Sequence, residues 1–136
     1  MVTALQNEKT VRDAFNGLVG TSAKKEILRF GKGAPSHEFD IFEKKKVIGG
    51  ISTSPWFNKP KGSKRRTGNT AGQDRAATEL LWLSLWQGPE RRVHILTDKE
   101  MTKRLFKKFT GACFQKNVEI HHFDLESKKF RHVGTL

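Results

Sequence analysis

The sequence predicts a single α/β domain, residues 1–136, in which helices flank a mixed central sheet in the order α-β-β-β-α-β-α-β. Three short runs rich in Ile, Val, Phe and Thr follow the first helical segment, and two more each follow a helix. Strands joined by short turns pair antiparallel, whereas strand–helix–strand units pair parallel. A chain of 136 residues can bury one core but is too short for two domains.

The first half of the chain predicts one helix and three strands. Residues 3–16 form the helix, with Thr3 as its N-cap and Gly17 as its stop. Its apolar stripe consists of Leu5, Val11, Phe15 and Leu18. From residue 24 onward, β-branched and aromatic residues recur between turn residues, which predicts a meander of three strands: KEILRF, HEFDIF and KVIGGIST.

A basic loop follows the meander, at about residues 55–72. Apolar periodicity is lost there, and Gly, Pro, Ser and Asn surround a run of cations without acidic interruptions. The cations are Lys59, Lys61, Lys64, Arg65 and Arg66. Such a segment is typical of a flexible surface loop.

The second half predicts two helices and three strands. Residues 74–87 form a buried central helix, since apolar side chains surround it from residue 80 onward. An interior strand, residues 91–97, leads to Asp98, which caps an amphipathic helix ended by Gly111. The inward face of that helix consists of Met101, Leu105, Phe106 and Phe109. Two final runs predict a strand and a short edge strand: VEIHHFDL and KKFRHVGTL.

Charge indicates the class of partner. Lys and Arg total 26 against 14 acidic residues, which gives a net charge of +12. This excess favours a polyanionic partner, and nucleic acid is preferred to a membrane because no apolar run approaches the roughly 18 residues of a spanning helix. The single cysteine excludes an intramolecular disulfide, and the N-terminus lacks a signal-peptide pattern. We therefore expect an intracellular protein, cytoplasmic or nucleoid-associated.

One acidic residue stands at a position with chemical meaning. Asp40 lies in HEFDIFEKKKVIGGIST, on the second predicted strand before a hairpin into the third. With the order of elements, this resembles the PD-(D/E)XK, or restriction-endonuclease-like, nuclease superfamily. The resemblance implies metal-dependent phosphodiester hydrolysis of DNA, with Asp40 as a ligand of Mg²⁺ or Mn²⁺. It departs at VIGGIST, where Gly50 and Ser52 replace the family's carboxylate and lysine.

The missing groups have candidate substitutes elsewhere. The resemblance suggests Asp74, as a second metal ligand, or Glu79 on the following helix, and Lys59 or Lys61 on the loop. Asp74 also has a structural explanation, because the dipole of a helix favours an acid in its first turn. The full set of candidate catalytic residues is Asp40, Ser52, Lys59, Gln73, Asp74 and Glu79. Glu8 and Glu26 are further carboxylates, although surface positions suffice to explain both.

Nucleic-acid contacts are expected on the loop and beside it. Lysine and arginine neutralise phosphates, hydroxyls donate to them, and an aromatic ring can stack on unpaired bases. The candidate contacts are Ser54, Trp56, Lys59, Lys61, Lys64, Arg65, Arg66 and Arg75. Zinc is not expected, because the adjacent His121 and His122 point to opposite faces of a strand.

Two other functions stay open. An inactive member of the same fold would act as a DNA- or RNA-binding accessory subunit. The absence of the family's E-x-K motif, whose carboxylate and lysine are replaced here by Gly50 and Ser52, favours this function. A basic RNA-binding α/β domain is the third hypothesis, because nothing in the sequence separates RNA from DNA. If the chain is a nuclease, one small domain has one active centre, so cutting both strands requires a homodimer or successive nicks.

Overall fold

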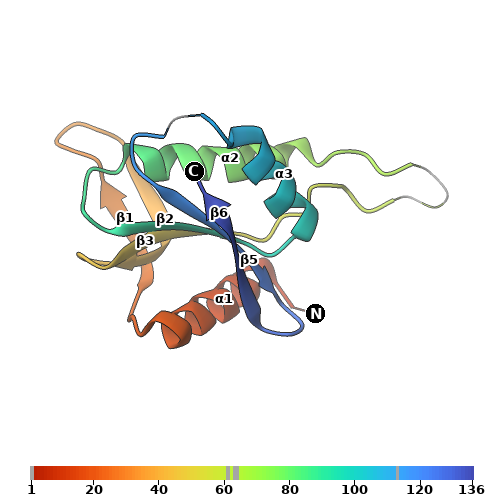
Figure 1. Cartoon of the computed structure of the whole chain (residues 1–136), viewed down its shortest axis with the longest axis horizontal. Helices are drawn as coiled ribbons and strands as arrows, with labels where there is room; N and C mark the ends of the chain where they lie inside the picture. Colours follow the sequence, from red (N-terminus) through yellow and green to blue (C-terminus); the bar gives the residue numbers. More distant parts are fainter. Residues whose placement is uncertain (1, 61, 63–64, 113) are drawn as a thin grey trace.

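The protein is built on a six-stranded sheet whose strands lie in chain order, β1 to β6. A computed structural model describes residues 2–60, 62, 65–112 and 114–136. Helix α1 covers one face of the sheet, and α2 and α3 cover the other (Figure 1). The predicted mixed sheet with flanking helices is confirmed, and so is the C-terminal edge strand.

The strand pairing follows from the connections. The meander strands β1 (Lys24–Arg29), β2 (Ser36–Glu43) and β3 (Val47–Ser52) pair antiparallel. Strands β4 (Arg91–Leu96) and β5 (Val118–Asp124) each follow a crossover helix and pair parallel with the preceding strand. Strand β6 (Lys129–Thr135) pairs antiparallel with β5 at the edge of the sheet. The carboxyl ends of β3, β4 and β5 therefore lie at one edge of the sheet.

The helix starts follow from capping side chains. Thr3 caps α1 (Ala4–Val19) in a reciprocal arrangement with Gln6, and Asp98 caps α3 (Lys99–Phe109) by accepting from the Met101 N–H at 2.8 Å. One predicted stop was wrong, since α1 runs through Gly17 to a left-handed Gly20. The other is confirmed, because α3 ends at Phe109 and Gly111 follows it with a positive φ of 87°.

Helix α2 (Thr70–Leu85) begins four residues earlier than the predicted start at residue 74, because Asn69 accepts from the Gly72 N–H and caps it. It is also less buried than predicted: Leu81 is 55% exposed and Leu85 47%. In α1, likewise, Val11 and Phe15 are buried, but Leu5 and Leu18 are exposed. A helix on one face of a sheet buries one stripe only.

The segment between β3 and α2, residues 55–69, is called the arm here. Its base is paired rather than a free loop: the Asn58 N–H donates to the Thr67 carbonyl, and the Asn69 N–H to the Trp56 carbonyl, both at 2.8 Å. The described parts of the arm project away from the sheet (Figure 1). The predicted loop of residues 55–72 was therefore too long at its C-terminal end, where α2 begins.

Candidate active site between the ends of β2 and β3

Asp40 occupies a bulge in β2. Lys24 pairs with Phe42 and Glu26 with Phe39, so β2 has one extra residue opposite Lys25. A β-bulge re-aims a side chain and bends its strand. Backbone pairing of β2 with β3 runs as far as Ile41 and Gly49, and the next contact is the Ile51 N–H donating to Asp40 Oδ2 at 2.8 Å. The Asp40 carboxylate thus lies between the diverging strands.

Glu79 of α2 reaches the same place because Gly50 leaves it room. A Cβ atom on Gly50 would lie 2.3 Å from Glu79 Cγ and 2.4 Å from Glu79 Oε1. Glu79 Oε2 is fixed by His37 Nε2 at 2.9 Å, and the His37 ring stacks on Trp82 at 4.7 Å. The absence of a side chain at Gly50 therefore leaves the space into which a carboxylate from the helix fits.

Glu8 of α1 supplies a third carboxylate. Its Oε2 lies 3.3 Å from Lys25 Nζ, an ion pair without the alignment of a hydrogen bond. Burial lowers the pKa of Lys25, but Glu8, with Asp40 and Glu38, raises it to a net value above its ordinary one. Lys25 thus remains a cation beside the carboxylates.

A polar pocket of about 330 Å³ brings these elements together. It is lined by Ala4, Glu8, Ile51, Ser52, Thr53, Ser54, Gly72, Arg75 and Glu79. Asp40 lies beside it through its hydrogen bond to Ile51. We call this pocket, with Asp40, the carboxylate pocket. It lies at the carboxyl end of β3.

The charge of the carboxylate pocket is only partly compensated. Burial raises the pKa of Asp40 to about 6, and the nearby Glu8 and Glu79 raise it too, against the Ile51 N–H and Lys25, which lower it. Glu8 Oε2 and Glu79 Oε1 are buried without a hydrogen-bond partner in the described part of the chain. Glu8 Oε2 keeps its ion pair with Lys25, whereas a buried carboxylate oxygen without a partner, such as Glu79 Oε1, is costly and would be relieved by a cation.

Ser52 is held in the carboxylate pocket by a buried histidine. Ser52 Oγ lies 2.7 Å from His94 Nε2, and His94 is fully buried, which lowers its pKa to about 3 and keeps it neutral. His94 Nδ1 has no hydrogen-bond partner among the described residues. An unpaired buried N–H is rarer than an unpaired acceptor, so we assign the proton to Nε2. The Ser52 hydroxyl is then free to donate into the pocket.

Several predicted catalytic residues lie elsewhere. Asp74 is exposed in the second turn of α2, since the helix begins at Thr70, and it does not line the pocket. Gln73 donates to the Trp56 carbonyl at 3.0 Å and so anchors the arm. Lys59 is exposed on the arm. Of the two suggested relocated carboxylates, only Glu79 lines the pocket and acts electrostatically on Asp40.

The predicted nucleic-acid contacts divide between pocket and arm. Ser54 and Arg75 line the carboxylate pocket and contact each other, Arg75 donating from Nη2 to Ser54 Oγ at 3.2 Å. Trp56 is partly buried at the arm base, and Arg65 and Arg66 are exposed on the arm. Lys61 and Lys64 lie outside the described residues.

Four residues of the site were missed or undervalued: Lys25, His37, His94 and Glu8. Glu8 and Glu26 seemed equivalent in sequence, and only the packing of α1 against the sheet selects Glu8. No sequence signal pointed to Lys25, because its role depends on the bulge opposite it. Periodicity identified the strand of His94, but not which of its neighbours would meet the histidine ring.

A second cluster of possible ligands lies on the β5–β6 hairpin. His121 pairs with His132, and these rings, with Glu119, place one ligand atom each within 4.8 Å of one another. His132 lies across the hairpin from His121, so its position in the sequence gave no sign of this contact. Arg91 takes both Glu119 oxygens, from Nε at 2.6 Å and Nη2 at 2.8 Å. The cluster is therefore explained as an ion-pair network.

Among the described residues, no helix has both the length and the apolar character that crossing a bilayer requires. Comparisons with protein-family models, with curated proteins and with solved structures found no match for this chain.

Proposed function

We propose that this protein hydrolyses phosphodiester bonds of DNA in a reaction that depends on a divalent cation. The observation that carries the proposal is the fit of Glu79 over Gly50, beside Asp40. In the restriction-endonuclease-like pattern that the sequence resembles, a carboxylate stands at the position of Gly50. Here a carboxylate comes to that position from α2, which supports a relocated active site.

The chemistry of the donor set fits a hard cation. Asp40, Glu79 and Glu8 offer carboxylate oxygens, two of which lack hydrogen-bond partners in the described chain, and Mg²⁺ and Mn²⁺ prefer such ligands. These three residues would hold the ion, although their oxygens do not converge as one ligand group in the described part of the chain. When bound, the cation would stabilise negative charge on the phosphate and activate a water molecule.

The remaining groups of the carboxylate pocket can bind and orient the substrate. The Ser52 and Ser54 hydroxyls and the Arg75 guanidinium line the space beside the carboxylates, where they would donate to phosphate oxygens. Lys25 is the candidate substitute for the lysine that Ser52 replaces, because its charge acts on Asp40 and lowers the pKa of that carboxyl group. With a pKa of about 6, Asp40 is mostly ionised at neutral pH.

Charge supports a nucleic-acid substrate. The net charge is +12, and the arm, which follows the pocket residue Ser54 in the chain, carries Lys59, Arg65 and Arg66 in exposed positions. Phosphate neutralisation by such side chains gives affinity that falls with salt. The preference for DNA over RNA comes from the family resemblance alone.

The test is cleavage of supercoiled plasmid and of labelled single-stranded DNA and RNA, with Mg²⁺, with Mn²⁺ and with EDTA. We expect metal-dependent cutting that is lost in Asp40→Asn and Glu79→Gln. Asp74→Asn is the matched control, since it removes an acid from α2 outside the pocket. Undiminished cutting by both pocket variants would refute the assignment.

A specific observation also favours a second function, an inactive accessory subunit of the same fold. Glu8 and Glu79 already have basic neighbours, Lys25 and His37, and Ser52 stands in place of the lysine. Salt-sensitive binding of DNA or RNA without cleavage under any metal would select this function over the nuclease.

A further inference from the structure

We propose that a groove between α3 and β6 binds an unpaired segment of a nucleic-acid strand, with a base on its floor and phosphates on its rim. The groove has a volume of about 460 Å³ and is lined by Lys99, Thr102, Lys103, Phe106, Lys107, His122, Arg131 and Val133. It is separate from the carboxylate pocket. The inference rests on the proposed class of ligand, nucleic acid, but not on catalysis.

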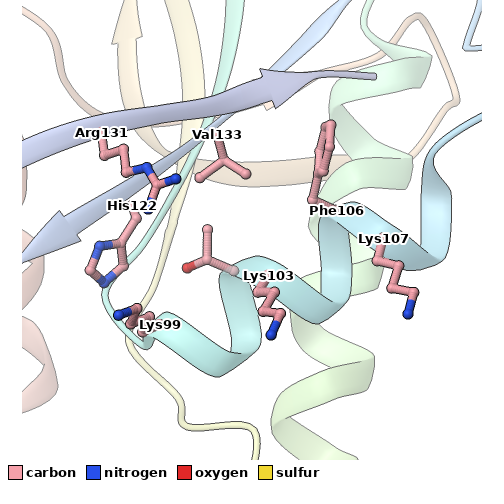
Figure 2. A pocket seen from close by; sticks show the side chains of 8 residues that line it. Lys99, Lys103, Phe106, Lys107, His122, Arg131 and Val133 are labelled. Carbon is pink, nitrogen blue, oxygen red and sulfur yellow. The ribbon is translucent and has the colours of Figure 1, made fainter.

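The floor of the groove is apolar and its shape is set by a glycine. Figure 2 shows the Phe106 ring rising from α3 toward β6 and Val133 facing back toward the helix. A Cβ atom on Gly134 would lie 2.3 Å from Phe106 Cζ, so only glycine lets this ring lie against the strand. The result is a partly buried aromatic surface open to a ligand with a flat apolar face.

The rim is cationic. Lys99, Lys103 and Lys107 follow each other at intervals of four residues along α3, about 6 Å apart along its axis. Arg131 and His122 lie across from them on β6 and β5 (Figure 2). None of the residues that line the groove is acidic.

These charges are available to a ligand. The ion pairs in the described part of the chain include none of four rim cations: Lys99, Lys103, Lys107 and Arg131. Glu100, the acid on the same helix, is paired with Arg104 at 2.9 Å. A rim whose lysines and arginine form no ion pair among the described residues is complementary to a polyanion.

The combination of floor and rim selects an unpaired strand over a duplex. The bases of a duplex are stacked inside it, so a duplex would offer phosphates to the rim and nothing to the apolar floor. A single strand offers both, and base–aromatic stacking on a basic surface is its usual mode of binding.

The groove is continuous with the arm through α3. Arg104, next to Lys103 in sequence, places its guanidinium 5.5 Å from the Trp56 ring and 5.2 Å from the Phe57 ring. Asp98, at the start of the same helix, accepts from the Trp56 N–H at 3.1 Å. A strand held at the arm base can therefore continue into the groove along one helix.

The experiment measures the affinity of a labelled twelve-nucleotide oligothymidylate by fluorescence anisotropy in EDTA, across a series of salt concentrations. Lys103→Ala/Lys107→Ala should weaken binding about tenfold and reduce the salt slope by about 1.4, at roughly 0.7 per lost phosphate contact on a single strand. The control, Lys44→Ala/Lys129→Ala, removes the same charge from exposed positions outside the groove and should have a much smaller effect.

A second variant separates stacking from charge. Phe106→Leu keeps an apolar side chain against Gly134 but removes the ring, and should weaken oligothymidylate binding about fivefold with an unchanged salt slope. A twelve-base-pair duplex should bind more weakly and be insensitive to Phe106→Leu. A fluorescent polyglutamate peptide should show no dependence on Phe106.

The proposal fails if the groove variant behaves like its control, or if Phe106→Leu affects duplex, peptide and single strand alike. The outcome is distinguishable from the fate of the catalytic proposal, because binding is measured without metal. Binding that depends on the groove, without cleavage, would support the groove as a binding site and contradict the nuclease proposal. Cleavage with binding that does not depend on the groove would support the nuclease proposal and contradict the groove.

Discussion

Gly50→Ala tests whether the glycine exists to admit Glu79. The new Cβ would lie 2.3 Å from Glu79 Cγ and 2.5 Å from Glu79 Cδ, so the carboxylate must leave its place. Its hydrogen bond to His37, formed at 2.9 Å, would be lost with it. A hydrogen bond to a charged group contributes about 1.5–3 kcal/mol to the free energy of unfolding. Replacing Gly with Ala restores about 0.5–1 kcal/mol of that stability, because it restricts the unfolded chain.

The expected net loss is therefore about 1–2 kcal/mol. For a chain of 136 residues, the unfolding entropy is about 0.29 kcal/mol per kelvin, so the melting temperature should fall by about 3–7 °C. Cleavage should be lost as fully as in Glu79→Gln, because the carboxylate no longer faces Asp40. Calorimetry and the plasmid assay measure the two effects.

The decisive measurement is a double-mutant cycle with Glu79→Ala. In that background the collision is absent, so Gly50→Ala should be neutral or slightly stabilising. Glu79→Ala alone should also lose the hydrogen bond to His37, a cost that is offset in part because the substitution removes a carboxylate oxygen that is buried without a partner. Strictly additive costs of the two substitutions would show that Gly50 and Glu79 do not interact and would refute the relocated carboxylate.

Three further predictions concern Asp40, Asp98 and the arm. Because the pKa of Asp40 is raised to about 6, the folded state binds a proton more tightly than the unfolded one, so this group lowers stability as pH rises from about 4 to 6. Asp40→Asn should therefore be more stable than the parent at pH 7, by up to about 3 kcal/mol, with the difference vanishing below pH 4 in urea titrations. Asp98 Oδ2 accepts two hydrogen bonds, one that caps α3 and one from the arm base. Asp98→Ala removes both and should lower the free energy of unfolding by about 1–2 kcal/mol, as measured by thermal unfolding, whereas Asp98→Asn should retain part of this stability. Replacing Lys59, Arg65 and Arg66 with Ala should weaken binding to DNA of any sequence and flatten the salt dependence, and an unchanged slope would exclude the arm as a contact.

Features of the fold could be predicted from the sequence wherever one short stretch of chain determines the local structure. Thr3 and Asp98 cap their helices because a hydroxyl or carboxylate three residues ahead of a free N–H is a local geometry. The strands followed from β-branched and aromatic runs between turn residues, and the mixed pairing followed from the connections between them. The errors at Gly17 and at the start of α2 have the same origin, since a glycine does not end a helix that tertiary contacts continue.

The site needed more than local information. Sequence reasoning could select Asp40 from its place on the second strand and could offer Asp74 and Glu79 as alternatives, but it could not choose between them. The choice depends on where α2 begins and which of its faces meets β3, and the absence of a side chain at Gly50 decides that contact.

By itself, then, the sequence determined the charge, the order of elements, the helix starts fixed by Thr3 and Asp98, and the candidate Asp40. Only the tertiary structure brought Glu8, Asp40 and Glu79 together and gave Lys25 and His94 their neighbours. These contacts join two helices, α1 and α2, to strands distant in the chain, and they arise from packing on both faces of one sheet. The physical reason is that a local pattern specifies the periodicity of one element, whereas the meeting of side chains depends on the relative placement of several.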